Sequence, residues 1–318
     1  MVDGFSVPIL LIIFNRLETT KRVLAEIKKI RPLSLFIAAD GPRQDRMSEN
    51  EKCEEVRNYV INNIDWDCAI KTLFRKKNLG CKLAVSSALD WFFTQTAQGI
   101  ILEDDCLPDQ SFFPYCEELL RLYHDNEKVF MISGNNFLLK RQTERASYYF
   151  SRHTHIWGWA SWRRAWGTYD ITLKDYPEFI ENKIIEKVWS SQNVREYWLQ
   201  CFNMVHENKL DTWDYQWTYN IWKHNGVCIA PRVNLVSNIG YGSEETHGSA
   251  QKSKTLDRPL EVMNFPLIHP ESMNVDQAAD NYENNNYFLR GFLVKKGLKK
   301  IGLFNLAKWI CKKLNYQY

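Results

Sequence analysis

The sequence predicts an α/β fold, in which a mostly parallel sheet is flanked by helices in one main domain. Two observations indicate it: short apolar runs alternate with longer segments of helical spacing, and the connections between them are short. The chain has 318 residues, of which 45% are hydrophobic and 25% are charged. These values suit a globular protein with a sizeable buried core.

Five continuous apolar runs are expected as buried strands, because such runs are typical of parallel sheets with both faces covered. They span residues 9–14, 33–39, 69–74, 99–102 and 128–133. The segments between them have apolar residues at helical spacing, which predicts helices over residues 18–30, 49–64, 82–94 and 112–123. Beyond residue 133 the pattern is less regular and richer in Trp, Tyr and His, and we place the second half of the main domain there, up to residue 245.

Polar side chains follow three of the predicted strands at the point where each strand ends. Asn15 and Arg16 follow the first strand, Asp40 follows the second, and the run Glu103 to Asp105 follows the fourth. In open sheets of this kind, ligands bind at the carboxyl ends of the strands. The three clusters therefore predict one site at this edge of the sheet.

The acidic run Glu103-Asp104-Asp105 directly follows a buried strand. Three adjacent carboxylates at this place lower the stability of the fold, because like charges repel one another. A bound divalent cation would relieve the repulsion, and carboxylate oxygens are ligands that Mn²⁺ and Mg²⁺ prefer. No cluster of His or Cys lies nearby, which argues against zinc. The alternative is an acidic helix start, with Asp109 and Ser111 capping the next helix.

Five segments of the chain resemble, in order, motifs of the GT-A fold N-acetylglucosaminyltransferases that begin complex N-glycans. They are residues 100–113 (IILEDDCLPDQSFF), 129–136 (VFMISGNN), 156–166 (IWGWASWRRAW), 212–217 (TWDYQW) and 238–247 (NIGYGSEETH). The resemblance covers roughly residues 7–250, and the chain also looks like bacterial sugar transferases of the same superfamily. It implies a GT-A domain over residues 1–245 that binds a nucleotide-sugar and transfers its sugar, with inversion.

Two departures from that family limit what the resemblance implies about the acceptor. TWDYQW has one residue more between Asp and the second Trp than the eukaryotic pattern, and the acceptor-side loops do not match. An N-glycan acceptor is therefore not carried over. We expect a glycan or lipid-linked glycan acceptor, in cell-surface polysaccharide synthesis, and a UDP-sugar as the favoured donor.

The resemblance assigns donor-binding roles to residues at the strand ends. Asn15 and Arg16 would hold the nucleotide, Asp40 would accept the N–H of a uracil base, and Arg43 would assist it. Lys82 opens a helix whose N-terminus could attract phosphate. Each has an ordinary structural alternative: Arg16 could pair with Glu18 or another carboxylate, Asp40 could stabilise its own turn, and the loop before Lys82 could serve only as a turn.

The acidic run and a later aspartate receive the catalytic roles. Asp105 resembles the family's metal ligand, while Glu103 and Asp104 would lie near the ribose and sugar hydroxyls. Asp214 is the expected general base, which would take the proton of the acceptor hydroxyl. Asp211 is the competing candidate for the base, and Asp214 could instead cap a helix over residues 215–222.

Aromatic and glycine-rich segments are expected to complete the sugar pocket. Trp157, Gly158 and Trp159 would form a wall of it, and Trp159 is expected to contact the donor. At least one of the two Trp side chains is expected in the core. His247 would contact the diphosphate or the metal from a loop in which Gly240, Gly242 and Gly248 permit closure. A solvated loop His is the alternative.

The C-terminal part of the chain is polar and then strongly basic. Residues 246–286 have weak periodicity and are expected as a loop or linker, whereas residues 287–318 are expected as a basic amphipathic helix. From Phe288 onward there are eight Lys or Arg and no Asp or Glu. Such a helix could bind an anionic membrane surface, or it could pack on the domain with its Lys side chains in solvent.

Charge and cysteine content narrow the location and the partners. A net charge of +3 is too small to indicate nucleic-acid binding. The eight Cys form no CxxC pair, and no basic leader with a cleavable apolar segment precedes the first strand. We therefore expect a cytoplasmic protein with free thiols, and a location on the inner face of the cell membrane if the C-terminal helix binds a membrane surface.

Two other function classes are compatible with parts of the pattern. A nucleotidyltransferase that makes nucleotide-sugars should have a Gly-rich loop with a basic residue after the first strand, where this chain has FNRLETT. A non-catalytic carbohydrate-binding protein would use the 12 Trp residues but would not need the acidic run. Metal-dependent binding of a nucleoside diphosphate separates these classes.

Overall fold

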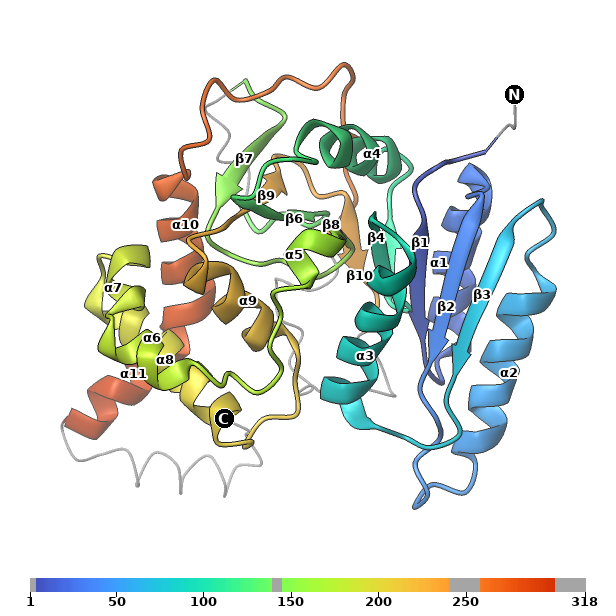
Figure 1. Ribbon diagram of the computed structural model, residues 1–318, viewed down its shortest axis with the longest axis horizontal. Helices are drawn as coiled ribbons and strands as arrows, with labels where there is room; N and C mark the ends of the chain where they lie inside the picture. The colour runs from blue at the N-terminus through green and yellow to red at the C-terminus, as the bar shows by residue number, and fades with distance from the viewer. Residues whose placement is uncertain (1–3, 139–144, 241–257, 301–318) are drawn as a thin grey trace.

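The computed structural model describes residues 4–138, 145–240 and 258–300. It confirms the α/β fold with a mostly parallel sheet flanked by helices (Figure 1). The eight strands of the main sheet lie in the order β3-β2-β1-β4-β8-β6-β9-β7. Strands β3, β2, β1 and β4 are parallel to one another, β8 is antiparallel to both of its neighbours, and β7 runs antiparallel at the edge.

The first half of the chain alternates strands and helices as the sequence predicts. Its strands are β1 (Ile9–Ile13), β2 (Ser34–Ala39), β3 (Ala69–Phe74), β4 (Gln98–Glu103) and β6 (Val129–Ser133). Its helices are α1 (Leu17–Ile30), α2 (Glu49–Asn62), α3 (Gly80–Gln95) and α4 (Phe112–Leu122). Every boundary lies within two residues of the predicted one, because continuous apolar runs and clear helical spacing leave little ambiguity.

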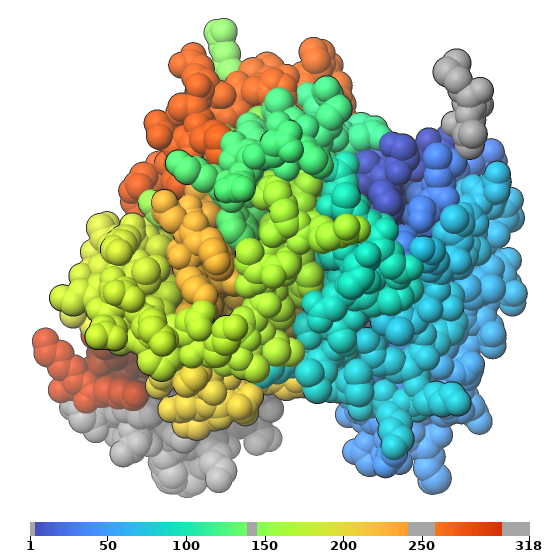
Figure 2. Space-filling view, in the orientation of Figure 1, coloured from blue at the N-terminus to red at the C-terminus, as the bar shows by residue number. Residues whose placement is uncertain are grey.

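The second half of the main domain adds short elements around the sheet. The strands are β7 (Tyr148–Ser151), β8 (Trp159–Trp162) and β9 (Val227–Pro231), while β10 (Val236–Asn238) pairs with β5 (Cys106–Pro108) in a small separate sheet. The helices are α5 (Arg163–Trp166), α6 (Tyr176–Glu181), α7 (Ile184–Val188), α8 (Gln192–His206) and α9 (Asp214–Lys223). The two halves of the chain lie side by side in one body (Figure 2).

The C-terminal segment differs from the linker expected over residues 246–286. Helix α10 (Gln277–Glu283) continues through a π-helical turn, η1 (Asn284–Phe288), into α11 (Leu289–Lys300). Leu289 is buried and Nζ of Lys296 pairs with Glu196 on α8, so this part of the basic helix packs on the domain. The predicted helix beyond residue 300 lies outside the described residues, and no described helix is long and apolar enough to cross a membrane.

Two apolar cores lie on opposite faces of the sheet, because successive side chains of a strand point to opposite faces. In β1, Ile9, Leu11 and Ile13 pack with α1, α2 and α4, whereas Leu10 packs on the other face with α3 and the helices of the second half. Both faces of β1 are therefore covered, and only the ends of the strands are free to build a site. The seven cysteines within the described residues form no disulfide.

Candidate functional site

The sheet order brings the three predicted polar clusters together. Strand β1 lies between β2 and β4, so the residues that follow these strands share one edge of the sheet. A small cavity of about 160 Å³ opens there, and its walls include Arg16, Asp40, Arg43, Glu103 and Asp104. The prediction of one site at the carboxyl ends of these strands agrees with this geometry.

Arg16 is paired with the acidic run. Its Nη2 lies 2.5 Å from Oδ1 of Asp104, and its Nη1 lies 2.8 Å from Oδ2 of Asp105. The backbone N–H of Phe14 also donates to Asp104, at 3.1 Å. The sequence left open which carboxylate pairs with Arg16. In the structure Arg16 pairs with Asp104 and Asp105, whereas Glu18 pairs with Lys21.

One guanidinium does not balance three carboxylates. Burial and the charges of Asp105 and Asp104 raise the pKa of Glu103 to about 8. Burial also raises the pKa of Asp104 to about 6, although Arg16 opposes that rise. Ionisation of all three carboxyl groups together is therefore unfavourable here, and a bound cation would favour their ionised forms.

The carboxylates fit Mg²⁺ or Mn²⁺ only in one way. Within the described residues, no three His, Cys, Asp or Glu side chains are placed to surround an ion. These cations commonly bind through one or two carboxylates, with substrate phosphates and water completing the shell. Asp105 is the candidate for such a role. It is only 8% exposed, and its Oδ2 lies 2.8 Å from Nη1 of Arg16, which lines the cavity.

Gly240 packs closely against the Arg16–Asp105 ion pair. The backbone N–H of Ile239 donates to the carbonyl oxygen of Asp105, which brings the end of β10 against the acidic run. A Cβ at position 240 would lie 2.4 Å from Oδ2 of Asp105 and 2.7 Å from Nη1 of Arg16. Any larger residue at this position would require the side chains of Asp105 and Arg16 to shift. His247, Gly242 and Gly248 lie outside the described residues.

Asn15 and Arg43 meet on a shared carboxylate, that of Glu49 in the first turn of α2. Nδ2 of Asn15 donates to Glu49 at 3.0 Å, and both Nε and the backbone N–H of Arg43 donate to the same carboxylate, at 3.0 and 2.7 Å. Burial opposes ionisation of Glu49, but the hydrogen bonds from Arg43 outweigh it and lower its pKa. Arg43 remains on the cavity wall and lies over the ring of Phe14.

Asp40 holds two loops together at the cavity wall. Its carboxylate accepts N–H groups of Gly41 at 2.9 Å and of Leu79 at 3.0 Å. Burial raises its pKa, and these hydrogen bonds oppose the rise. The turn-stabilising alternative is therefore present in the structure, while the position on the cavity wall leaves the base-reading role as a prediction.

The N-terminus of α3 is not open to phosphate, contrary to the expectation for Lys82. Asp211 occupies it and accepts the backbone N–H groups of Cys81 at 3.2 Å and Lys82 at 3.1 Å. Gly80 has φ +78°, and a Cβ there would lie 2.7 Å from Oδ2 of Asp211. Nζ of Lys82 bonds to Asn208 and does not line the small cavity. Asp211, the competing candidate for the base, is thus a helix cap.

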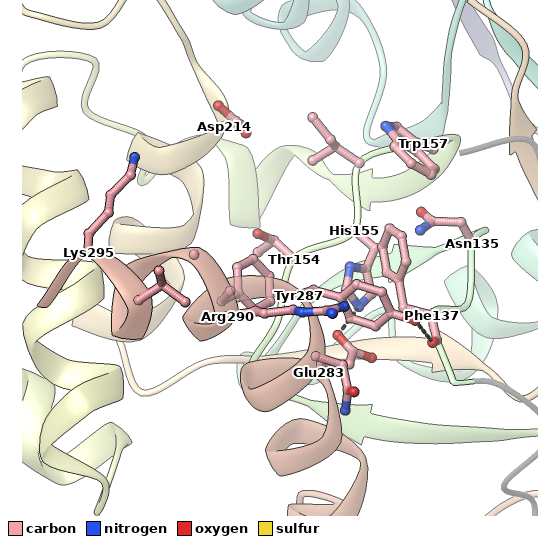
Figure 3. Close-up of a pocket in the computed structure, with 15 residues that line it drawn as sticks. Asn135, Phe137, Thr154, His155, Trp157, Asp214, Glu283, Tyr287, Arg290 and Lys295 are labelled. Atoms are coloured by element: carbon pink, nitrogen blue, oxygen red, sulfur yellow. Dashed lines mark hydrogen bonds and ion pairs between the residues drawn. The ribbon is translucent and has the colours of Figure 1, made fainter. Parts of the chain in front are cut away.

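Asp214 faces a second and larger cavity of about 770 Å³ (Figure 3). It is the first residue of α9, and its carboxylate accepts a hydrogen bond from the hydroxyl of Thr212. Burial raises the pKa of Asp214 above the ordinary aspartate value. Its negative charge also contributes to the raised pKa of Glu103, which lines the smaller cavity.

The two tryptophans of the predicted sugar wall have different places. Trp157 lines the larger cavity. Trp159, the one expected to bind the donor, is the first residue of β8 and is fully buried in the core, where its ring stacks on Trp213 at 5.8 Å. The assignment of Trp159 to the pocket is therefore wrong, because a strand begins at this residue and turns its side chain inward. Gly158 has φ +63° and makes the turn between them possible.

The sequence assigned no role to several residues of the larger cavity, although Asn135 lies in the segment 129–136 that contributes to the family resemblance. Asn135 follows β6, His155 lies between β7 and β8, and Glu283 and Tyr287 come from the C-terminal helix. The end of β6 was a signal that could have indicated Asn135, since it is one more strand end. Nothing in the pattern of residues 277–288 indicated that this helix would return to the site.

Comparisons with known proteins show distant similarity of fold only. No protein-family model matches the sequence, and a search of curated proteins finds no match. Among solved structures, HddC from Yersinia pseudotuberculosis is similar over 50% of this chain and 77% of its own, with 7% identity and a TM-score of 0.32. A second structure of HddC, in complex with GMP-PN, has a TM-score of 0.31, 8% identity and the same coverage. The 4-diphosphocytidyl-2C-methyl-D-erythritol synthase from Anaerococcus prevotii is similar over 58% of this chain and 77% of its own, with 11% identity and a TM-score of 0.28.

Proposed function

We propose that this protein is a metal-dependent glycosyltransferase that transfers a sugar from a nucleotide-diphospho-sugar to a hydroxyl of a glycan or lipid-linked glycan acceptor. The observation that carries the proposal is the placement of Asp214. A buried carboxylate of raised pKa lines a cavity large enough for a sugar, next to a smaller cavity with an excess of carboxylate charge. Such a pair of sites suits a reaction between two substrates held side by side.

The smaller cavity would hold the donor. Asp40 and Arg43 stand at one side of it and the acidic run at the other, on the edge where strand ends bind ligands. Asp105 would hold Mn²⁺ or Mg²⁺ together with the donor diphosphate, and the ion would offset the charge left on the departing nucleoside diphosphate. Arg16 keeps the carboxylates in place by its bonds to Asp104 and Asp105.

Asp214 would act as the general base. As the acceptor oxygen attacks the anomeric carbon, its proton passes to the Asp214 carboxylate, and the bond between the sugar and the diphosphate breaks with its electron pair on the diphosphate. Attack from the opposite face inverts the anomeric centre. The hydrogen bond from Thr212 orients the carboxylate, and the raised pKa of Asp214 makes it a stronger base than an exposed aspartate.

A panel of nucleotide-sugars tests the proposal and separates it from the alternative. The protein is incubated with Mn²⁺ and UDP-, GDP- or dTDP-sugars, and release of the nucleoside diphosphate is measured. We expect slow hydrolysis of at least one donor, lost on removal of the metal. Release of pyrophosphate from a nucleoside triphosphate and a sugar phosphate would instead identify a nucleotidyltransferase, and metal-independent binding without either reaction would identify a binding protein.

A further inference from the structure

Asn135 carries a buried amide for which the described residues supply no hydrogen-bond partner. It follows β6 directly, is 2% exposed and lines the larger cavity. Neither Nδ2 nor Oδ1 has a hydrogen-bond partner among the described residues. Figure 3 shows this amide directed toward the space between Trp157 and His155. An unpaired buried amide costs stability, so a residue of this kind requires an explanation.

The next residue shows that the local backbone can satisfy an asparagine. Asn136 is equally buried at 2% exposure, but its Nδ2 donates to the carbonyl oxygen of Pro231 and its Oδ1 accepts the N–H of Leu138. The two neighbours therefore differ in their hydrogen-bond partners. Asn136 is hydrogen bonded to the backbone, whereas the amide of Asn135 has no partner among the described residues.

Aromatic side chains surround Asn135 in the cavity. The ring of Phe137 contacts those of Trp157 at 5.3 Å, His155 at 4.7 Å and Tyr287 at 5.3 Å between centroids. The hydroxyl of Tyr287 donates to the carbonyl oxygen of Phe137, which fixes its ring. The π-helical turn η1 places Tyr287 there, and such turns are frequent at functional sites.

A buried pair forms the polar floor of the same cavity. Nε2 of His155 lies 2.8 Å from Oε2 of Glu283, and their side chains are 2% and 0% exposed. The hydroxyl of Tyr149 lies 3.3 Å from the other oxygen of Glu283. Flat aromatic faces beside fixed hydrogen-bonding groups are the features that recognise a sugar ring, with its apolar C–H faces and its rim of hydroxyls.

We propose that Asn135 and the aromatic wall around it bind a pyranose ring of the acceptor, with the Asn135 amide hydrogen bonded to its hydroxyls. This inference rests on the proposed function, since it takes the larger cavity as the acceptor side. It adds to that function by naming the residues, Asn135 and the aromatic wall, that would hold a sugar ring of the glycan acceptor. Asn135 would bind the sugar ring of the acceptor, and Asp214 would accept the proton of the attacking acceptor hydroxyl.

The test compares Asn135→Leu with Asn136→Leu in the full chain. Because the described part of the chain offers the Asn135 amide no hydrogen-bond partner, its replacement should leave the melting temperature within about 2 °C of wild type, or raise it. Asn136→Leu should lower the melting temperature by more than about 3 °C, since it leaves backbone groups of Pro231 and Leu138 unpaired. An equal loss in both variants would show that Asn135 is structural and would overturn the proposal.

Binding is measured with methyl glycosides of glucose, galactose, mannose and N-acetylglucosamine, by titration and saturation-transfer NMR in the presence of UDP and Mn²⁺. We expect at least one glycoside to bind wild type and to bind Asn135→Leu at least about tenfold more weakly. Equal binding to both proteins, or none to wild type, would overturn the proposal. Should Asn135→Leu fail to fold, Asn135→Ala is judged by the same criteria.

The same samples report the affinity for UDP with Mn²⁺, which depends on the smaller cavity. If the wild-type protein does not bind UDP, the result would count against the proposed function even if a glycoside bound at Asn135. Conversely, normal UDP binding without any glycoside binding would sink the inference about Asn135 and leave the donor site intact. The two failures are therefore distinguishable.

Discussion

Nη1 of Arg16 donates a 2.8 Å hydrogen bond to Oδ2 of Asp105, the carboxylate that we expect to hold the metal. The guanidinium reaches from the end of β1 to the end of β4, and it also binds Asp104. It therefore holds two mutually repelling carboxylates in place when no cation is present. A divalent cation bound with the donor would add positive charge at the same point, so Arg16 and the cation would both stabilise the ionised carboxylates.

Arg16→Gln should destabilise the protein by about 3 kcal/mol, because it leaves two buried carboxylates without their partner. Mn²⁺ should then raise the melting temperature of the variant more than that of wild type. Thermal unfolding with and without Mn²⁺ measures both effects. Arg46→Gln is the control, since Arg46 is exposed and lies 3.9 Å from Glu49, and it should change stability by less than about 1 kcal/mol. Equal stability of Arg16→Gln and wild type would contradict the account.

Asp214→Asn should abolish sugar transfer and donor hydrolysis, with a loss of at least about 100-fold, and leave UDP binding intact. Asp211→Asn is the matched control, since Asp211 caps α3 through the N–H groups of Cys81 and Lys82. That variant should lose about 1 kcal/mol of stability but keep its chemistry. Measured rates and melting temperatures of the two variants decide the assignment, which is wrong if Asp214→Asn keeps near-normal turnover.

The rate should depend on pH through Asp214. Burial raises the pKa of Asp214, and Asp214 must lose its proton before it can accept another. The rate therefore falls as pH drops through this raised pKa, so the acidic limb should lie above the usual range of aspartate near 4. A pH profile of donor hydrolysis at saturating donor measures it. A limb at or below pH 4, or the same limb in Asp214→Asn, would rule Asp214 out as the base.

Gly240→Ala should lower stability by roughly 1–3 kcal/mol and disturb the Arg16–Asp105 pair, because the added Cβ would meet both side chains. Gly297→Ala offers a control of opposite sign, since Gly297 lies in α11 with open space around its Cα and alanine favours a helix by about 1 kcal/mol. Chemical denaturation measures both. If Gly240→Ala were as stable as wild type, the close packing on Asp105 would be absent.

Much of the fold could be predicted from local sequence. The ends of strand β1 and helix α2 were predicted to within two residues. A continuous apolar run is typical of a buried strand, and apolar residues at helical spacing are typical of a helix. The joint placement of Arg16, Asp40 and Glu103 followed from the same logic, since parallel neighbours end at one edge.

The partners of the site residues could not be predicted in this way. Asp211 is bonded to Cys81, which is 130 positions away in the sequence, and no local pattern distinguishes such a cap from a catalytic carboxylate. Trp159 and Trp157 are two residues apart, and which of them enters the core depends on where β8 begins. Tyr287 reaches the larger cavity only because a π-helical turn connects α10 to α11, in a segment whose weak periodicity predicted a linker.

The central claim is that a divalent cation bound beside Asp105, at the end of β4, stabilises the negative charge of a nucleoside diphosphate. Isothermal titration of UDP into wild type and Asp105→Asn, each with and without Mn²⁺, tests it most directly, with Asp65→Asn as a surface control. The account predicts that Mn²⁺ tightens UDP binding to wild type and to Asp65→Asn by at least about tenfold, and that Asp105→Asn loses this gain. Equal affinity of wild type for UDP with and without Mn²⁺ would contradict it.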